Sequence, residues 1–513
     1  MPRFKPYDYR QRKLLPVSFE HQIVPGTFEY SLSYLVDYEL DLSVFNHRYA
    51  NDDSGRPAYD PAILLKIVLL AYSRGVTSSR KIAALCEQNV LFMAMSADSR
   101  PHFTTIAEFI SSCHEEIAVL FRQVVLVCDE LGLIGGELFA IDGCKLPSNA
   151  SKEWSGTLAD LRKKRKKIDG AVKRILRKHR EADRREEEED EDIVEREKRQ
   201  VSTLRKASRK IRDFLAENGE KIGSSGKPIQ SNITDNESAK MKTSHGVIQG
   251  YIGVAGVDAK HQVVVHAEAH GKPQEHELLK PAVEGIREAL ELGGSGRDAL
   301  RKGKVIADSG YHSRKNVEYL KAEKVDGYIA DIGYRSRDER FQSAKRHWPK
   351  ERVKPKKRFV VEDFDYDLKK RTCRCPTGKS MWLRCARVKI GNTEFMQFQA
   401  RESDCDACEL RSRCLRSGAQ RARSRQVNIR LNETREARTS ALEQMRRKID
   451  SVLGRHIYSH RLGIVEPVFG HITEALGIKR FSLRGREKVN GQWRLMTMIH
   501  NIAKIHRYGW STG

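Results

Sequence analysis

The strongest constraint on the fold comes from two short apolar runs that each lead into a single aspartate. Residues 139–141 precede Asp142, residues 305–307 precede Asp308, and a glycine follows each aspartate within two residues. Short runs rich in β-branched and apolar residues predict strands buried on both faces, as in an α/β sheet. Each strand is therefore expected to deliver one carboxylate to its exposed tip.

A third acid, Glu466, lies in a stretch with helical rather than strand spacing. Tyr458, Arg461 and Phe469 flank it at intervals of one to two helical turns. Two strands and a helix could thus each supply one carboxylate to a common point. Three acids without an obligatory histidine or cysteine suit oxygen-ligated Mg²⁺ or Mn²⁺, and such a site suits phosphoryl transfer.

Phosphodiester chemistry indicates a division of roles among the three acids. Two divalent ions, Mg²⁺ or Mn²⁺, would activate the nucleophile and stabilise the leaving oxygen. We expect Asp142 to bridge both ions, while Asp308 and Glu466 each complete one. Asp235 and Asp258 are the alternative acids, and their contexts are typical of a loop cap and a hairpin turn.

The charge of the chain indicates its partner. The 513 residues carry a formal charge of +25 and the pI is near 9.6, an excess that attracts polyanions such as nucleic acid. The longest apolar stretch, residues 62–72, is too short to cross a bilayer and contains Lys66, and the N-terminus lacks a signal core. We expect a cytoplasmic, nucleoid-associated protein with no membrane partner, whose ten cysteines are reduced thiols or metal ligands.

Residues 1–136 are predicted to form a helical domain. A helix starts at Pro61 and ends at Gly75, and a second helix, capped by a nearby serine, carries Arg80 and Lys81. Helix, glycine turn and basic helix are typical of a helix-turn-helix that binds DNA ends. The alternative interpretation is a helical domain that only packs.

Residues 158–222 are too charged to form a core. Apolar residues keep three-and-four spacing in both halves, and the acidic run 186–192 separates them. Opposite charge blocks on two apolar seams favour an antiparallel helical hairpin or coiled coil inserted into a catalytic domain, although a solvated spacer would show similar charges. Strand patterns resume at 247–257 and 262–269, and a helix is expected from about 275 to 292.

At this point the chain resembles the bacterial insertion-sequence transposases of the DDE class. The resemblance rests on Gly55–Pro61, Ser78–Ile82, Thr104–Ile106, Asp308–His312, the series Tyr458, Arg461 and Glu466, and the stretches Phe469–Ile472, Arg480–Phe481 and Arg484–Gly485. Many relatives carry a lysine two helical turns beyond the glutamate. Here that position is Thr473, and the nearest lysine is Lys479.

The resemblance implies an RNase H-like α/β core with a mixed sheet, an N-terminal all-α domain, and two insertions. The core would comprise 137–157, 223–332 and the C-terminal helices 456–513, interrupted by the charged segment 158–222 and a cysteine-containing segment 333–455. It also implies a homodimer or higher oligomer that binds double-stranded DNA at the element's terminal inverted repeats, cleaves it, and joins the ends to target DNA. An RNase H-like nuclease, a non-catalytic DNA-binding protein and a decayed copy are the alternatives.

Cysteines in the second insertion indicate a metal of another kind. Cys405 and Cys408 form a C-x-x-C pair, Cys414 follows, and Cys375 lies in a Pro-Thr-Gly turn. This set is compatible with one structural Zn²⁺; Cys373 could replace Cys375, or all could be ordinary thiols. Several basic residues surround Glu466, and DNA contacts are expected from Arg461, Lys479, Arg480 and Arg484.

Overall fold

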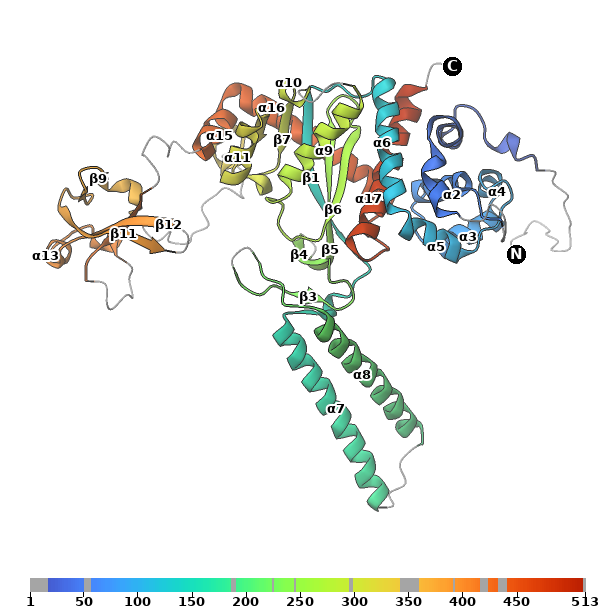
Figure 1. The fold of residues 1–513 in the computed structure, drawn as a ribbon, viewed down its shortest axis with the longest axis horizontal. Coiled ribbons are helices and arrows are strands. Elements are labelled where there is room, and N and C mark those ends of the chain that lie inside the picture. The colour runs from blue at the N-terminus through green and yellow to red at the C-terminus, as the bar shows by residue number, and fades with distance from the viewer. Residues whose placement is uncertain are drawn as a thin grey trace, which may run out of the picture. The chain divides into compact units, whose positions relative to one another are not determined.

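The computed structural model describes residues 17–49, 57–185, 191–223, 226–243, 246–294, 299–341, 359–390, 393–415, 423–431 and 441–510. The chain divides into a core unit, Met1–Ala330 with Val452–Gly513, and a cysteine unit, Asp331–Ser451. Figure 1 shows the elements of both. Most of the acidic run at 186–192, and Gly55 and Arg56 of the resemblance, lie outside the described residues.

The N-terminal part of the core unit is helical, as predicted. Its helices are α1 (Phe28–Tyr34), α2 (Pro61–Ser73), α3 (Ser79–Gln88), α4 (Val90–Met95), α5 (Phe103–Ser112) and α6 (His114–Glu130). Helix α2 begins where Asp60 accepts a hydrogen bond from the Ala62 N–H at 2.7 Å, with Pro61 at the first helical position. It ends before Gly75, whose φ of +72° belongs to the left-handed region that glycine adopts most readily.

The last helix, α17 (Arg486–Lys504), joins these helices to the sheet. It contacts α2, α5 and α6 as well as strand β6 (Val264–His270). Gln492 donates a hydrogen bond to the Tyr72 hydroxyl at 3.0 Å, and the Trp493 indole donates to the Val254 carbonyl at 2.9 Å. The N-terminal helices therefore share their core with the C-terminus of the chain.

The core unit contains a six-stranded mixed sheet of order β4-β5-β1-β7-β8, with β6 also paired to β5. Its other strands are β4 (Ala239–Thr243), β5 (Gly246–Asp258), β1 (Leu138–Pro147), β7 (Lys304–Ala307) and β8 (Asp326–Ile329). β1, β7 and β8 are parallel, whereas β4, β5 and β6 run antiparallel to their neighbours. The apolar run before each aspartate forms the buried centre of this sheet.

Helices cover both faces of the sheet. A Cβ on Gly253 would meet Trp493 of α17, and a Cβ on Gly256 would meet Ile286 of α9 (Leu279–Leu292). Residues three apart in a strand point to opposite faces, so α17 and α9 lie on opposite sides. Helix α9 begins at Leu279, later than predicted from sequence. Helix α16 (Val452–Gly470) contacts β1, β5, β7 and β8.

Residues 158–222 contain two long helices, α7 (Leu158–Arg185) and α8 (Glu191–Glu217), which run side by side (Figure 1). A small apolar cluster at their base includes Leu161, Ile211 and Phe214. The Ser208 hydroxyl donates a hydrogen bond to Asp169 at 2.5 Å, which links the two helices further along. These contacts hold the two helices against each other.

The cysteine unit has a five-stranded antiparallel sheet of order β13-β12-β11-β10-β9. Its strands are β9 (Asp365–Asp367), β10 (Thr372–Arg374), β11 (Ser380–Ile390), β12 (Thr393–Gln399) and β13 (Gln426–Arg430), and its short helices include α12 (Tyr334–Arg337), α13 (Glu402–Asp406), α14 (Arg411–Cys414) and α15 (Ala441–Asp450). In the described parts of the chain, no helix is both long and apolar enough to span a membrane.

Candidate active site

Parallel pairing of β1 and β7 brings Asp142 and Asp308 next to each other. Ile141 pairs with Ala307, and each aspartate is the residue that follows directly after this pair. β7 ends at Ala307, as predicted. The prediction that Asp142 ends its strand was wrong, because β1 continues to Pro147 in antiparallel pairing with β5, where Asp142 lies opposite Ala255.

One buried arginine contacts both aspartates. Arg461, on α16, places Nη1 2.6 Å from Asp142 Oδ2 and Nη2 3.4 Å from Asp308 Oδ1. Its side chain is 10% exposed, so the guanidinium is almost withdrawn from water. Asp142 also accepts a hydrogen bond from the Gly143 N–H at 2.8 Å. The arginine predicted to bind DNA is therefore engaged with the carboxylates in this structure.

Burial gives Asp142 an unusual affinity for protons. Desolvation raises its pKa from 3.8 to about 6, and the charges of Asp308 and Glu275 add to this effect. Arg461 and the Gly143 N–H act in the opposite direction without cancelling it. A carboxylate whose pKa is raised by burial and by neighbouring acids is typical of functional sites.

Glu466, the predicted third acid, is on the same helix as Arg461 but its side chain is exposed. Its charge contributes to raising the Arg461 pKa, which places it near the site. The structure has no hydrogen bond or ion pair between Glu466 and either aspartate, all three being described residues. Across the described ranges, no three histidine, cysteine, aspartate or glutamate side chains are arranged, as they stand, to hold a metal ion.

Glu275 is a further acid beside the aspartates that sequence reasoning missed. It precedes α9 and forms an ion pair with Lys145 of β1, Oε1 to Nζ, at 3.2 Å. A Cβ on Gly143 would lie 3.9 Å from Glu275 Cγ, and a Cβ on Gly310 would collide with the Glu275 carboxylate. The glycines that follow both aspartates thus leave room for this side chain. These two glycines are a sequence signal that could have indicated the space.

Tyr311 completes the site. It is fully buried, and its hydroxyl has no hydrogen-bond partner among the described residues. The hydroxyl would lie 3.6 Å from a Cβ on Gly143. Burial, and then the charges of Asp142, Glu275 and Asp308, raise its pKa well above the usual value. A buried hydroxyl without a protein partner, next to these acids, is a polar group available to a bound ion or its water.

Both alternative acids serve structural contacts. Asp235 is buried and accepts a hydrogen bond from the Tyr251 hydroxyl at 2.9 Å. Asp258 is fully buried and accepts hydrogen bonds from the N–H groups of Gly135, Gly136 and Lys260. The backbone N–H groups thus satisfy the Asp258 carboxylate and hold the turn after β5.

The predicted DNA-contacting residues lie in two regions of the core unit. Arg480 and Arg484 donate to the carbonyls of Ser148 and Asn149 just beyond the end of β1, at 3.5 and 2.7 Å, and the exposed Lys479 pairs with Glu474 at 2.7 Å. Arg80 and Lys81 are exposed on α3. The Arg80 guanidinium stacks over the Phe103 ring of α5 at 4.7 Å.

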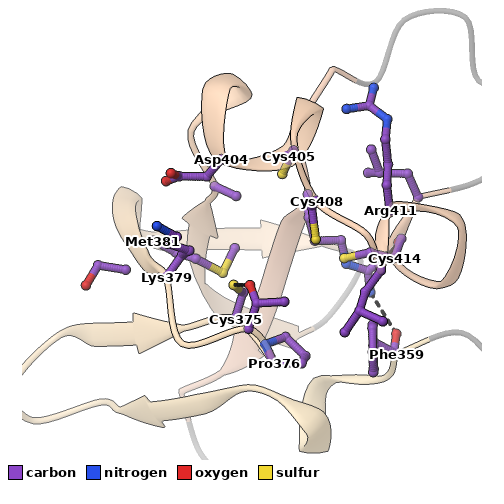
Figure 2. A pocket seen from close by; sticks show the side chains of 16 residues that line it. Phe359, Cys375, Pro376, Lys379, Met381, Asp404, Cys405, Cys408, Arg411 and Cys414 are labelled. Carbon is purple, nitrogen blue, oxygen red and sulfur yellow. Dashed lines mark hydrogen bonds between the residues drawn. The ribbon is translucent and has the colours of Figure 1, made fainter.

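Four cysteines line one small cavity in the cysteine unit (Figure 2). Cys375 lies in the turn between β10 and β11, Cys405 on α13, Cys414 on α14, and Cys408 between these helices. Cys373, the alternative ligand, is instead buried in the core with its Sγ 3.8 Å from Met381 Sδ. These are the four cysteines preferred from sequence.

Comparison with protein families decides the class of the chain. Residues 222–404 match a family model described as "Transposase DDE domain", residues 374–506 match a second model with the same description, and residues 17–112 match "Transposase domain (DUF772)". The chain belongs to the DDE transposases of insertion sequences. It is an enzyme of DNA phosphodiester cleavage and transfer, and transposases of this class bind DNA and use divalent metal ions.

The matched ranges divide the candidate site of this transposase. Asp308 lies in the first DDE match and Glu466 in the second, whereas Asp142 lies in neither. Asp142 is therefore linked to the site by its parallel pairing beside Asp308 and by Arg461. No curated protein sequence gives a significant match to the chain.

Proposed function

We propose that this transposase binds the ends of its insertion sequence, cleaves them, and joins the 3′-OH ends to target DNA at a site built on Asp142, Asp308 and Glu466. The contact of Arg461 with both aspartates carries the proposal, because it gathers acids from two strands around one helix. The strand order, with antiparallel β5 and β6 followed by parallel β7 and β8, supports an RNase H-like core.

The residues present fit two Mg²⁺ or Mn²⁺ ions. Aspartate and glutamate oxygens are the ligands these hard ions prefer, and Tyr311 offers a hydroxyl that has no hydrogen-bond partner in the described part of the chain. Asp142, Asp308 and Glu466 would hold the ions, which when bound would activate the attacking oxygen and stabilise the leaving one. Glu466 would have to turn inward from its exposed position on α16.

Other side chains organise the site without joining the chemistry. Arg461 holds the two aspartates at a fixed separation and partly offsets their mutual repulsion. We assign Glu275 as a positioning residue, because its carboxylate lies against Gly310 in the turn that presents Asp308. Lys145, on the same strand as Asp142, pairs with Glu275 and would hold that carboxylate in place.

DNA binding would be divided between two surfaces. Arg80 and Lys81 on the exposed side of α3 would contact the inverted repeats, and Arg480 and Arg484 would contact the backbone near the end of β1. The excess of positive charge over the chain supports both contacts. Two copies acting on two element ends would make the active assembly a homodimer or a higher oligomer.

The test is an end-cleavage and strand-joining assay with the full-length protein, labelled element ends and Mg²⁺. Asp142→Asn, Asp308→Asn and Glu466→Gln should each abolish both reactions, whereas DNA binding by these variants should stay at the wild-type level. The control Glu277→Gln, at an exposed residue, should cleave and join as the wild type does. Retained cleavage in Asp308→Asn would remove that residue from the site. Cleavage of any DNA without joining would identify a nuclease, and binding without cleavage by the wild type would identify a decayed copy.

A further inference from the structure

The cavity in the cysteine unit is lined by thiols that come from three separate pieces of backbone. Figure 2 shows Cys375 facing Cys408 and Cys414 across the cavity, with Cys405 beside Cys408. The cavity volume of about 30 Å³ exceeds the roughly 10–15 Å³ that one water molecule needs, yet leaves no room for an organic cofactor. A single metal ion is small enough to fit this cavity.

The local backbone is built from tight turns around these cysteines. The Gly378 N–H donates to the Cys375 carbonyl at 2.8 Å, and the Cys375 N–H donates to the Lys379 carbonyl at 2.9 Å. Gly378 has a φ of +82°, which this reversal requires. The Arg411 N–H donates to the Cys408 carbonyl at 3.0 Å. Cys375 and Cys408 therefore each lie at a tight turn beside the cavity.

Charge and packing also favour a metal. Lys379, Arg411 and Arg425 line the same cavity, and a tetrathiolate metal centre, which is anionic, would be stabilised by such neighbours. The hydrophobic cluster on the sheet of this unit has eight buried side chains, and Cys375, Cys405 and Cys414 pack against it. A metal held by these cysteines would tie the turn and the short helices to that cluster.

We propose that Cys375, Cys405, Cys408 and Cys414 bind one structural Zn²⁺ that ties the β10–β11 turn to helices α13 and α14. The sulfurs are not at ligand distance as they stand, but rotation about χ1 moves each one without moving the backbone. Binding converts four thiols to thiolates and releases their protons to solvent, with no change of oxidation state. Four sulfur ligands close the coordination sphere, so the ion is not part of the DNA chemistry.

The first test measures metal in the full-length protein purified without chelator. We expect about one Zn²⁺ per chain by elemental analysis, and loss of most of it in Cys408→Ser and Cys414→Ser. Cys385→Ser is the matched control, because Cys385 is half-buried in the same unit, donates to the Arg387 carbonyl and lies outside the cavity. Zinc retained in Cys408→Ser, or lost equally in Cys385→Ser, would contradict the proposal.

A second measurement does not depend on a variant folding. Wild-type protein stripped of metal and loaded with Co²⁺ should show the intense thiolate-to-cobalt and visible bands of a tetrahedral sulfur site. If these bands were absent and the protein took up no zinc under reducing conditions, the proposal would be contradicted, and the four cysteines would be ordinary thiols. Neither outcome bears on the carboxylate site, whose dependence on Mg²⁺ is measured separately.

Discussion

The Nη1 atom of Arg461 lies 2.6 Å from Oδ2 of Asp142, so a residue from the C-terminal helices holds an acid on the first strand of the sheet. The same guanidinium reaches Asp308 at 3.4 Å. A planar group with several donors can serve two carboxylates at once, which a lysine ammonium does less well. The geometry of both aspartates therefore depends on this one side chain.

We expect Arg461→Lys to fold but to lose roughly 100-fold in cleavage rate, because misplacement of the reacting groups by about 1 Å can cost that much. Arg461→Gln leaves the desolvated Asp142 carboxylate without its cation and should lower the free energy of unfolding by about 3 kcal/mol. Cleavage rates and urea denaturation measure the two effects. The exposed pair of Arg314 with Glu318 supplies the control Arg314→Lys, and equal losses there would contradict the role of Arg461.

The raised pKa of Asp142 predicts a pH dependence of metal binding. With a pKa of about 6, caused first by burial, the side chain is largely protonated below that pH in the metal-free protein. The stabilisation of the fold by added Mg²⁺, measured as a shift in Tm, should therefore shrink as the pH falls through 6. The shift should be nearly absent at every pH in Asp142→Asn.

The raised pKa of Asp142 also determines how the stability of the metal-free protein depends on pH. The folded-state value lies above the ordinary 3.8, so the native protein binds this proton more tightly than the unfolded chain does. The contribution of Asp142 to the free energy of unfolding should increase as the pH falls from about 6 to about 4. Comparison of wild type with Asp142→Asn over this range isolates it, and an opposite slope would refute the assignment.

Removal of the charge of Glu275 should shift the pH profile of cleavage. Its carboxylate is one of the groups that raise the pKa of Asp142, so Glu275→Gln should lower the midpoint of the acid limb as well as the maximal rate. A purely structural role would change the rate without moving the midpoint. Glu277→Gln is the matched control, because Glu277 is exposed and pairs with Lys272 instead.

Replacement of Arg80 and Lys81 by alanine should weaken binding to element ends in a salt-dependent way. If each contacts one phosphate, the slope of log K against log salt should fall by roughly 2 in magnitude. Lys321→Ala on α11 (Arg314–Ala322) is an exposed control away from these helices. The full-length protein is needed, because α17 packs against the N-terminal helices and a fragment ending near Gly136 would expose that core.

Local patterns in the sequence were enough to predict several elements. The apolar runs before Asp142 and Asp308 indicated buried strands, and Asp60-Pro61 and Gly75 indicated the limits of α2, because strand burial and helix capping depend on residues close together in the chain. The α/β class and the helical N-terminal region followed from these patterns, whereas the mixed sheet was expected from the family resemblance. The extension of β1 beyond Asp142 did not, because it depends on pairing with β5, more than a hundred residues away.

The sequence by itself determined which acids and thiols were candidates, whereas the tertiary structure decided which of them lie together. Strand pairing placed Asp142 beside Asp308, and helix packing brought Arg461 to both. The tertiary structure also places Glu275 beside the aspartates, in space that Gly143 and Gly310 leave free. It buries Cys373 in the core of the cysteine unit, whereas Cys375 lines the cavity. Such contacts join segments far apart in the chain, and no local spacing encodes the distance between them.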